Sequence, residues 1–125
     1  MSKSPNPEDL IPLSPAVFHI LLSLAEGERH GYAIMQSVQA LSGGRVRMGP
    51  GTLYGSIKRM LEAGLIIESS ERPDPELDDQ RRRYYKLTSL GERTLRLEVQ
   101  RLAELLRSTQ ARSLLPETGS SRGQE

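Results

Sequence analysis

Residues 50–65 read PGTLYGSIKRMLEAGL, and this stretch decides the fold. Its apolar residues recur at i, i+4, i+7 and i+8, which is the spacing of one face of a helix. They are Leu53, Ile57, Met60 and Leu61. Gly64 stands where a left-handed residue ends a helix, and the apolar run after it is typical of a strand. The stretch therefore predicts a helix over residues 51–63 that buries one stripe.

The residues off that stripe are mostly small, hydroxyl-bearing or basic. Such an outer face suits the major groove of DNA, because small residues allow close approach and cations reach phosphates or base edges. The candidate DNA contacts are Gly51, Thr52, Tyr54, Ser56, Lys58 and Arg59. The alternative is an ordinary amphipathic surface helix, and the stretch taken alone leaves both interpretations open.

Two further helices are predicted upstream. Ser14 and Pro15 form a helix start, and the strongly apolar residues that follow them predict the core helix of the domain. A second helix is predicted from His30 to about residue 41, and its inner face is formed at i, i+4 and i+7. The residues of that face are Ile34, Val38 and Leu41.

Tyr32 stands at the beginning of the second helix, where backbone N–H groups and the helix dipole favour an anion such as a DNA phosphate. The alternative role is a packed aromatic at the rim of the core, and one tyrosine can fill both roles. Arg45–Met48 alternates polar and apolar residues and predicts a short strand. The order helix, helix, short strand, helix indicates a helix-turn-helix with a strand in its turn.

A wing is predicted after the third helix. Residues 65–72 and 82–87 have strand character, and the prolines and acids of residues 73–80 predict the loop between them. Three arginines stand where the loop re-enters the sheet, and we expect them to contact DNA phosphates or the minor groove: Arg81, Arg82 and Arg83. The alternative is a solvated charge run, and Asp78 and Asp79 would repel DNA unless they pair with these arginines.

A long helix is predicted next. Ser89 and Glu92 fit a capping box, and the helix extends to about residue 110. Its apolar residues recur with heptad-like spacing and form a candidate dimerisation stripe: Leu95, Val99, Leu102 and Leu106. Because the small core is complete before this helix, we expect the stripe to pack against a second copy of the chain. The alternative is that the helix folds back on the first helix.

The composition indicates one small domain. Of the 125 residues 36% are hydrophobic and 4% aromatic, so we expect a small aliphatic core, a flexible arm over residues 1–12 and a disordered tail over 113–125. The absence of Cys excludes disulfides and Cys-ligated zinc. No signal peptide and no run near the roughly 20 residues of a membrane span is present, so we expect a soluble cytoplasmic protein without a membrane partner.

No catalytic constellation is expected either. The two His residues fall on different predicted elements, and no acid has an evident partner. We therefore expect a protein that is not an enzyme and that has no cofactor and no metal site.

Three segments resemble the PadR-like transcriptional regulators. They are Leu24–Ile34 with the motif HGYAI, Pro50–Ile66, and Arg81–Thr88 followed by Gly91. The resemblance covers about residues 13–110 and implies a winged helix-turn-helix of the subgroup with one C-terminal helix, a mainly α fold with a small antiparallel β wing. It also implies a homodimer, usually a repressor, that binds inverted-repeat operators in double-stranded DNA.

The resemblance further implies roles for individual residues. It places Thr52, Tyr54, Ser56, Lys58 and Arg59 on the recognition helix, Tyr32 at the start of the supporting helix, and Arg81–Arg83 at the wing. Many members have a glycine at the wing tip, whereas this chain has two prolines and several acids, so the arginines at its base are the expected contact. Some relatives bind small aromatic or drug-like effectors between subunits, but this chain has no Trp and only one Phe, Phe18, so its residues supply no aromatic cage.

We therefore expect a sequence-specific DNA-binding regulator with a DNA-binding domain over residues 13–88 and a dimerisation helix over residues 89–112. The alternative is a winged-helix protein-interaction module that does not bind DNA. The net charge of +1 and the acidic wing loop motivate that alternative.

Overall fold

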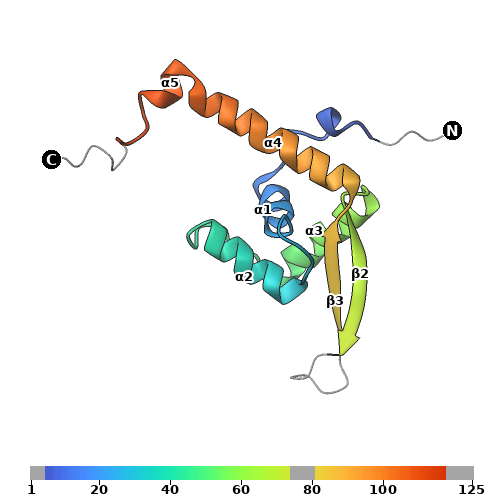
Figure 1. The fold of residues 1–125 in the computed structure, drawn as a ribbon. Coiled ribbons are helices and arrows are strands. Elements are labelled where there is room, and N and C mark those ends of the chain that lie inside the picture. The colour runs from blue at the N-terminus through green and yellow to red at the C-terminus, as the bar shows by residue number, and fades with distance from the viewer. Residues whose placement is uncertain (1–4, 74–80, 118–125) are drawn as a thin grey trace.

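The computed structural model describes residues 5–73 and 81–117 (Figure 1). Its elements are η1 (Pro7–Asp9), α1 (Pro15–Ser23), β1 (Arg29–His30), α2 (Gly31–Leu41), α3 (Pro50–Glu62), β2 (Ile66–Pro73), β3 (Arg81–Leu87), α4 (Ser89–Arg107) and α5 (Thr109–Arg112). Figure 1 shows α1, α2 and α3 gathered together, with β2 and β3 projecting as a wing and α4 crossing over α1 and extending beyond it. The predicted fold class, mainly α with a small antiparallel β wing, is confirmed.

The core is small and largely aliphatic, as the composition predicts. It joins α1, α2 and α3 to the first residues of β2, the end of β3 and the first half of α4. The buried residues are Ile20, Leu21, Leu24, Ile34, Val38, Leu53, Ile57, Met60, Leu65, Ile66, Tyr85 and Leu95. Burial raises the pKa of the Tyr85 hydroxyl above its ordinary value, because the ionised phenolate would lose its hydration.

The third helix, α3, follows its prediction closely. Pro50 occupies the first turn, where its missing N–H removes no helical hydrogen bond. The helix ends at a left-handed Gly64 with φ of +79°. The N–H of Leu65 donates to the Met60 carbonyl at 2.9 Å and that of Gly64 to the Leu61 carbonyl at 3.1 Å, which is a Schellman motif. One stripe residue differs from the prediction, because the Leu61 side chain is 37% exposed.

Side chains cap both α1, where the sequence predicts the cap at Ser14, and α2, where it predicts only the start of the helix. The Ser14 hydroxyl accepts the N–H of Val17 at 3.3 Å, and His30 Nδ1 accepts the N–H of Ala33 at 3.2 Å. Ile34 and Val38 are buried, but Leu41 is half exposed, so the predicted inner face of α2 ends one turn early. The helix terminates at Leu41.

The sheet differs from the prediction in its first strand. The strand order is β1-β3-β2, all antiparallel, with Arg29 opposite Tyr85 and His30 opposite Tyr84. The predicted strand over Arg45–Met48 is wrong, since these residues form an irregular segment after a turn at residues 42–44. Left-handed glycines at 43 and 44 reverse the chain there, and the Ser42 hydroxyl accepts the N–H of Val46 at 2.9 Å, so that backbone donor is satisfied locally. β3 already pairs on both sides, with β1 and β2.

The N-terminal cap of α4 lies one residue before its predicted position. Thr88, not Ser89, is the cap, and its Oγ1 accepts the N–H of Gly91 at 3.0 Å. The same Oγ1 donates to the carbonyl oxygen of Gly64 at 2.5 Å, and the N–H of Thr88 donates to the carbonyl oxygen of Leu65 at 3.1 Å. Thr88 therefore ties the first turn of α4 to the chain that leaves α3.

The close fit at this joint requires Gly91. A Cβ at Gly91 would lie 3.0 Å from the carbonyl carbon of Leu65 and closer still to its oxygen. The helix continues to Arg107, and after Ser108, which has an extended backbone, the short α5 follows. The single helix predicted to about residue 110 is thus interrupted at Ser108.

The predicted flexible arm is corrected for the described part of residues 1–12. η1 contacts α4, and Leu10 and Leu13 pack against the core. The Leu13 N–H donates to Glu98 Oε2 at 2.8 Å, while Glu98 Oε1 accepts Arg101 Nε at 2.6 Å. The hydrogen bond from Arg101 has the largest effect on the pKa of the buried Glu98 carboxyl. Together with the hydrogen bond from Leu13, it holds this pKa below its ordinary value, although burial acts in the opposite direction. The sequence predicts no such carboxylate bridge.

Several predicted features lie outside the described residues. They include the loop over 74–80 with its acidic residues and the last residues of the predicted tail, 118–125. Over the part of the chain that the structure describes, no helix is long and apolar enough to cross a membrane.

Candidate nucleic-acid interface

The outer face of α3 carries most of the predicted DNA contacts. Gly51, Thr52, Lys58 and Arg59 are exposed, and the Tyr54 side chain is 47% exposed. The placement of Ser56 on this face is wrong, because its side chain is fully buried. Ser56 follows Leu53 by three residues and precedes Met60 by four, so it lies on the inner stripe in spite of its polarity. Its Oγ accepts Arg59 Nη2 at 3.2 Å.

Tyr54 lies against the N-terminus of α2. A Cβ at Gly31 would lie 2.7 Å from Cζ of Tyr54 and closer still to its hydroxyl oxygen. Real Cβ atoms do not approach other atoms this closely, so only a glycine at position 31 admits the ring in this position. The sequence analysis did not assign this role to Gly31, and no short-range pattern links residues 31 and 54.

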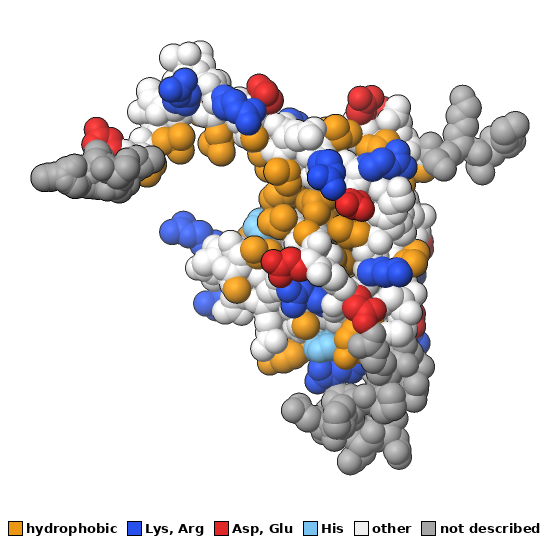
Figure 2. All heavy atoms as spheres, in the orientation of Figure 1, with side chains coloured by type: hydrophobic (Ala, Val, Ile, Leu, Met, Phe, Trp, Pro, Cys, Tyr) orange, Lys and Arg blue, Asp and Glu red, His pale blue; other side chains and the backbone are white. Residues whose placement is uncertain are grey.

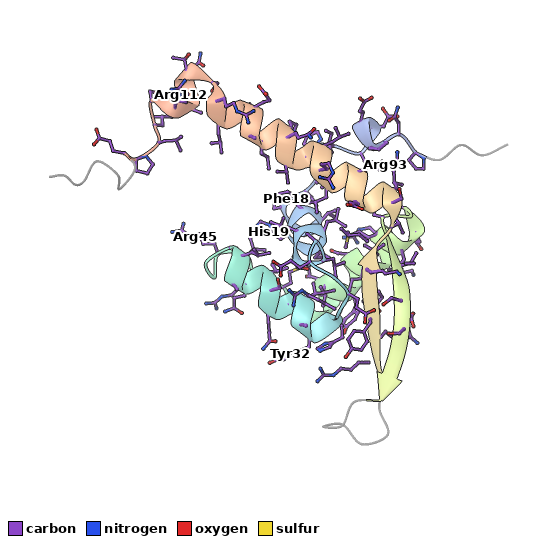
Figure 3. The ribbon with its side chains drawn as sticks, in the orientation of Figure 1. Phe18, His19, Tyr32, Arg45, Arg93 and Arg112 are labelled. Carbon is purple, nitrogen blue, oxygen red and sulfur yellow. The ribbon has the colours of Figure 1, made fainter. Side chains whose placement is uncertain are left out.

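Tyr32 follows Gly31 and points away from the core at the beginning of α2 (Figure 3). Its side chain is 55% exposed, so its ring is at most partly packed at the rim and its hydroxyl can reach a ligand. The exposed residues Gln36 and Gln39 follow Tyr32 at i+4 and i+7 and continue the same face of α2. The sequence analysis did not assign these two residues, although their spacing predicts a polar helix face.

The wing arginines occupy β3 as predicted, but their environments differ. Arg83 is exposed, whereas Arg82 is partly buried and its Nη1 lies at hydrogen-bond distance from His30 Nε2. The His30 ring packs edge-on against Tyr84 with a centroid distance of 5.3 Å. Arg81 is the first residue of β3, and its side chain lies outside the described part of the structure. Arg82 thus approaches the N-terminus of α2, where Tyr32 and Tyr54 also lie.

The predicted dimerisation stripe of α4 divides into two parts. Leu95 is only 6% exposed and belongs to the core of its own chain, so its prediction as an interface residue is corrected. The first half of α4 packs on α1 and β3, which is why Leu95 is covered. Beyond it, Val99 is 44% and Leu106 53% exposed, and Leu102 is partly exposed. Figure 2 shows hydrophobic side chains along the side of α4 and α5 that overhangs the helices below.

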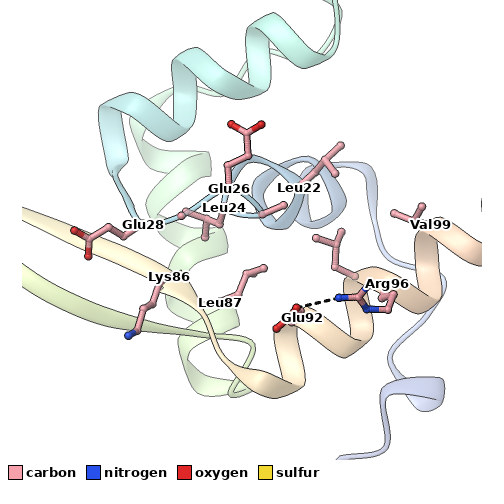
Figure 4. Close-up of a pocket in the computed structure, with 12 residues that line it drawn as sticks. Leu22, Leu24, Glu26, Glu28, Lys86, Leu87, Glu92, Arg96 and Val99 are labelled. Atoms are coloured by element: carbon pink, nitrogen blue, oxygen red, sulfur yellow. Dashed lines mark hydrogen bonds and ion pairs between the residues drawn. The ribbon is translucent and has the colours of Figure 1, made fainter.

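A cavity of about 560 Å³ lies between the end of α1, the end of β3 and the first half of α4 (Figure 4). Leucines and Val99 form its apolar part, and Glu26, Glu28 and Glu92 line it together with Lys86 and Arg96. Glu92 pairs with Arg96 at 3.0 Å. Among the described residues that line this cavity, none is aromatic.

The described residues contain no group of three His, Asp or Glu side chains placed to hold a metal ion. His19, which the core helix carries, is engaged locally, because its Nδ1 lies 2.7 Å from the carbonyl oxygen of Pro15. The polar surface around α2, α3 and β3 is therefore the strongest candidate site.

Comparison with known proteins connects this arrangement to a family. Residues 20–97 match the family model described as "Transcriptional regulator PadR-like family". The chain is 36% identical over 89 residues to "Transcriptional regulator Rv3488" of Mycobacterium tuberculosis, a match that covers 71% of this chain and 77% of that protein. It is also 37% identical over 86 residues to an "Uncharacterized 37.1 kDa protein in transposon TN4556" of Streptomyces fradiae, which covers 69% of this chain but only 22% of the length of that relative.

Among solved structures, a PadR-like transcription factor from Bacteroides fragilis is similar. Its TM-score is 0.59 at 27% sequence identity, and the match covers 71% of this chain and 81% of that one. The similarity in fold therefore extends over most of both chains.

Proposed function

Because the chain belongs to the PadR-like family of transcriptional regulators, we propose that it binds an inverted-repeat operator in double-stranded DNA as a homodimer and represses transcription. The observation that carries this proposal is the exposed face of α3, on which Thr52, Lys58 and Arg59 stand among small residues. The effector and the operator sequence are open parts of the proposal.

In the proposed complex α3 enters the major groove. Gly51 permits close approach at the start of the helix, because nothing lies within 4 Å of the position that a Cβ would occupy there. The hydroxyl of Thr52 and the cations of Lys58 and Arg59 then reach base edges or phosphates. Tyr54 presents its hydroxyl from the side of α3 that meets α2.

Phosphate contacts flank the helix in this proposal. Arg82 and Arg83 extend the positively charged surface along β3, and Tyr32 supplies a hydroxyl at the N-terminus of α2. Arg81 remains a proposed wing contact by its position in the strand. Arginine suits this role, since its planar fork of donors matches phosphate oxygens.

The second half of α4 supports the proposed homodimer. Val99, Leu102 and Leu106 form an apolar stripe that other parts of the chain leave exposed or only partly covered. Exposed contiguous apolar surface of this kind indicates an interaction site, and a second copy would bury it symmetrically. A dimer would present two α3 helices about one DNA turn, roughly 34 Å, apart.

The test uses DNA fragments from the region upstream of the protein's own coding sequence. We expect a discrete gel shift at moderate salt and a palindromic footprint whose half-sites are centred about 10 base pairs apart. Lys58→Ala and Arg82→Ala should each weaken binding and reduce the magnitude of the negative slope of log K against log salt by about 0.9. Arg93→Ala, which removes an exposed charge on α4, is the matched control and should leave the slope unchanged.

The outcomes separate the proposal from the protein-interaction module. If the wild-type protein shifts no fragment and protects no site, the DNA-binding proposal is wrong. If it binds but all three variants retain the wild-type salt slope, the assigned contacts are wrong while DNA binding stands.

A further inference from the structure

A polar groove runs along α2 beside the segment that leads into α3. Its volume is about 490 Å³. It is lined by Tyr32, Met35, Gln36, Gln39, Arg47, Met48 and Gly49. We call it the α2 groove. Apart from Tyr32, none of these residues takes part in the function proposed above.

The described residues that line the α2 groove include several hydrogen-bond donors and no carboxylate. The guanidinium of Arg47, the amides of Gln36 and Gln39 and the hydroxyl of Tyr32 can all donate. The cavity beside α4 is different, because three glutamates line it. A groove with several donors, one cation and no acid suits an anion that only accepts hydrogen bonds, such as a phosphodiester.

Arg47 is available for such a ligand. It is exposed in the irregular segment between α2 and α3, and its side chain makes no hydrogen bond or ion pair within residues 5–73 and 81–117. The backbone N–H of the preceding residue, Val46, donates to the Ser42 hydroxyl at 2.9 Å, which ties this segment to the end of α2. The Arg47 cation therefore extends from a segment that is attached to α2.

The α2 groove reaches the beginning of α3. Its lining includes Gly49, which is the N-cap of α3. It also includes Tyr32, which follows the glycine against which the Tyr54 ring of α3 lies. A duplex that lies on the first turn of α3 thus meets the groove without leaving the protein surface.

We propose that the α2 groove holds the sugar-phosphate backbone of the DNA that α3 reads, with Arg47 contacting a phosphate and Gln36 and Gln39 donating to the same or the next one. This inference rests on the proposed function and extends the proposed phosphate contact of Tyr32 along α2 and into the segment that precedes α3. The contacts fix the position of the duplex along α3 and carry no base information of their own.

The experiment measures binding of a fluorescent operator duplex by the full chain over a range of salt concentrations. Arg47→Ala should reduce the magnitude of the negative slope of log K against log salt by about 0.9, which corresponds to the loss of one phosphate contact. Arg45→Ala is the matched control, because Arg45 is an exposed arginine two residues away that does not line the groove. It lies beyond the C-terminal end of α2, far from Tyr32 (Figure 3). The salt slope of Arg45→Ala should equal that of the wild type.

A second measurement identifies the contacted atom. Operators are prepared with a single neutral methylphosphonate at each position in turn. One or two positions should weaken binding of the wild type several-fold yet have little effect on Arg47→Ala, since that variant has already lost the contact. The double variant Gln36→Ala, Gln39→Ala should weaken binding without changing the salt slope, because it removes no charge.

Each result supports or overturns the inference. Equal slopes for Arg47→Ala and wild type, or equal losses for Arg45→Ala and Arg47→Ala, would show that the groove holds no phosphate. A methylphosphonate pattern that is identical in wild type and Arg47→Ala would show the same. If the wild type binds no duplex at all, the proposed function fails and the inference fails with it, whereas the first three results leave the proposed function intact.

Discussion

Replacing Gly91 by alanine should destabilise the protein by about 1–5 kcal/mol, because the added methyl group meets the backbone of Leu65. The carbonyl carbon would lie 3.0 Å from the new Cβ, and a backbone carbonyl cannot rotate away as a side chain can. The first turn of α4 must therefore withdraw, which strains or breaks the two hydrogen bonds that Thr88 makes to Gly64 and Leu65.

The magnitude follows from three contributions. Overpacking costs about 1–3 kcal/mol, and each weakened hydrogen bond costs about 0.5–1.5 kcal/mol. Alanine in place of glycine within a helix stabilises the folded state by about 0.5–1 kcal/mol. The first two effects outweigh the third, so the net change is destabilising.

Urea denaturation followed by circular dichroism measures this change. Protein concentration must be equal for all variants, because dimerisation would add to the apparent stability. Gly55→Ala is the matched control, since the one atom within 4 Å of its Cβ position is Nη1 of the flexible Arg59 side chain at 3.8 Å. We expect that control to be as stable as the wild type or slightly more stable. If Gly91→Ala unfolds at the wild-type urea midpoint, the tight contact described at Leu65 is not real.

Three further predictions concern other contacts. Gly31→Ala should leave the urea midpoint nearly unchanged, because the ring of Tyr54 is half exposed and can swing outward, yet it should weaken operator binding several-fold; unchanged affinity would show that the position of Tyr54 is unimportant. Glu98→Gln should destabilise by about 1–3 kcal/mol at pH 7. Since the folded-state pKa of Glu98 is lowered, the wild type should lose this advantage as the pH falls below about 4, and a gap between the two urea midpoints that stays constant down to pH 3 would contradict the reasoning. Leu106→Glu should convert a dimer into a monomer in sedimentation experiments without a change in helicity, and a variant that remains dimeric would place the interface elsewhere.

The parts of the fold that are encoded locally could be predicted from the sequence. The stripe of α3 needs only the spacing of Leu53, Ile57 and Met60, and the end of the helix needs only Gly64. The wing strands were predicted for the same reason, because strand residues on both sides of a Pro- and Asp-rich segment are a local signal. These elements were placed within a residue or two of their observed bounds.

The features that depend on distant partners could not be predicted. β1 is two residues long, too short for any periodicity, and exists because β3 passes beside it some 50 residues later. Leu95 and Leu106 belong to the same heptad-like pattern, and the positions of α1 and β3 determine that the first is core and the second is surface. Ser56 was misplaced for another reason, since its polarity was given more weight than its angle on the helix.

The double attachment of Thr88 has a mechanical consequence. Its hydroxyl and its amide hold two successive carbonyls at the exit of α3, while its own backbone begins α4. These hydrogen bonds restrain the angle between α3 and α4, so we expect a tilt of α4 to move α3 with it. In the proposed homodimer, the distance between the two α3 helices would then depend on the crossing angle of the two α4 helices. A ligand that changes this crossing angle would therefore release the duplex without contacting DNA.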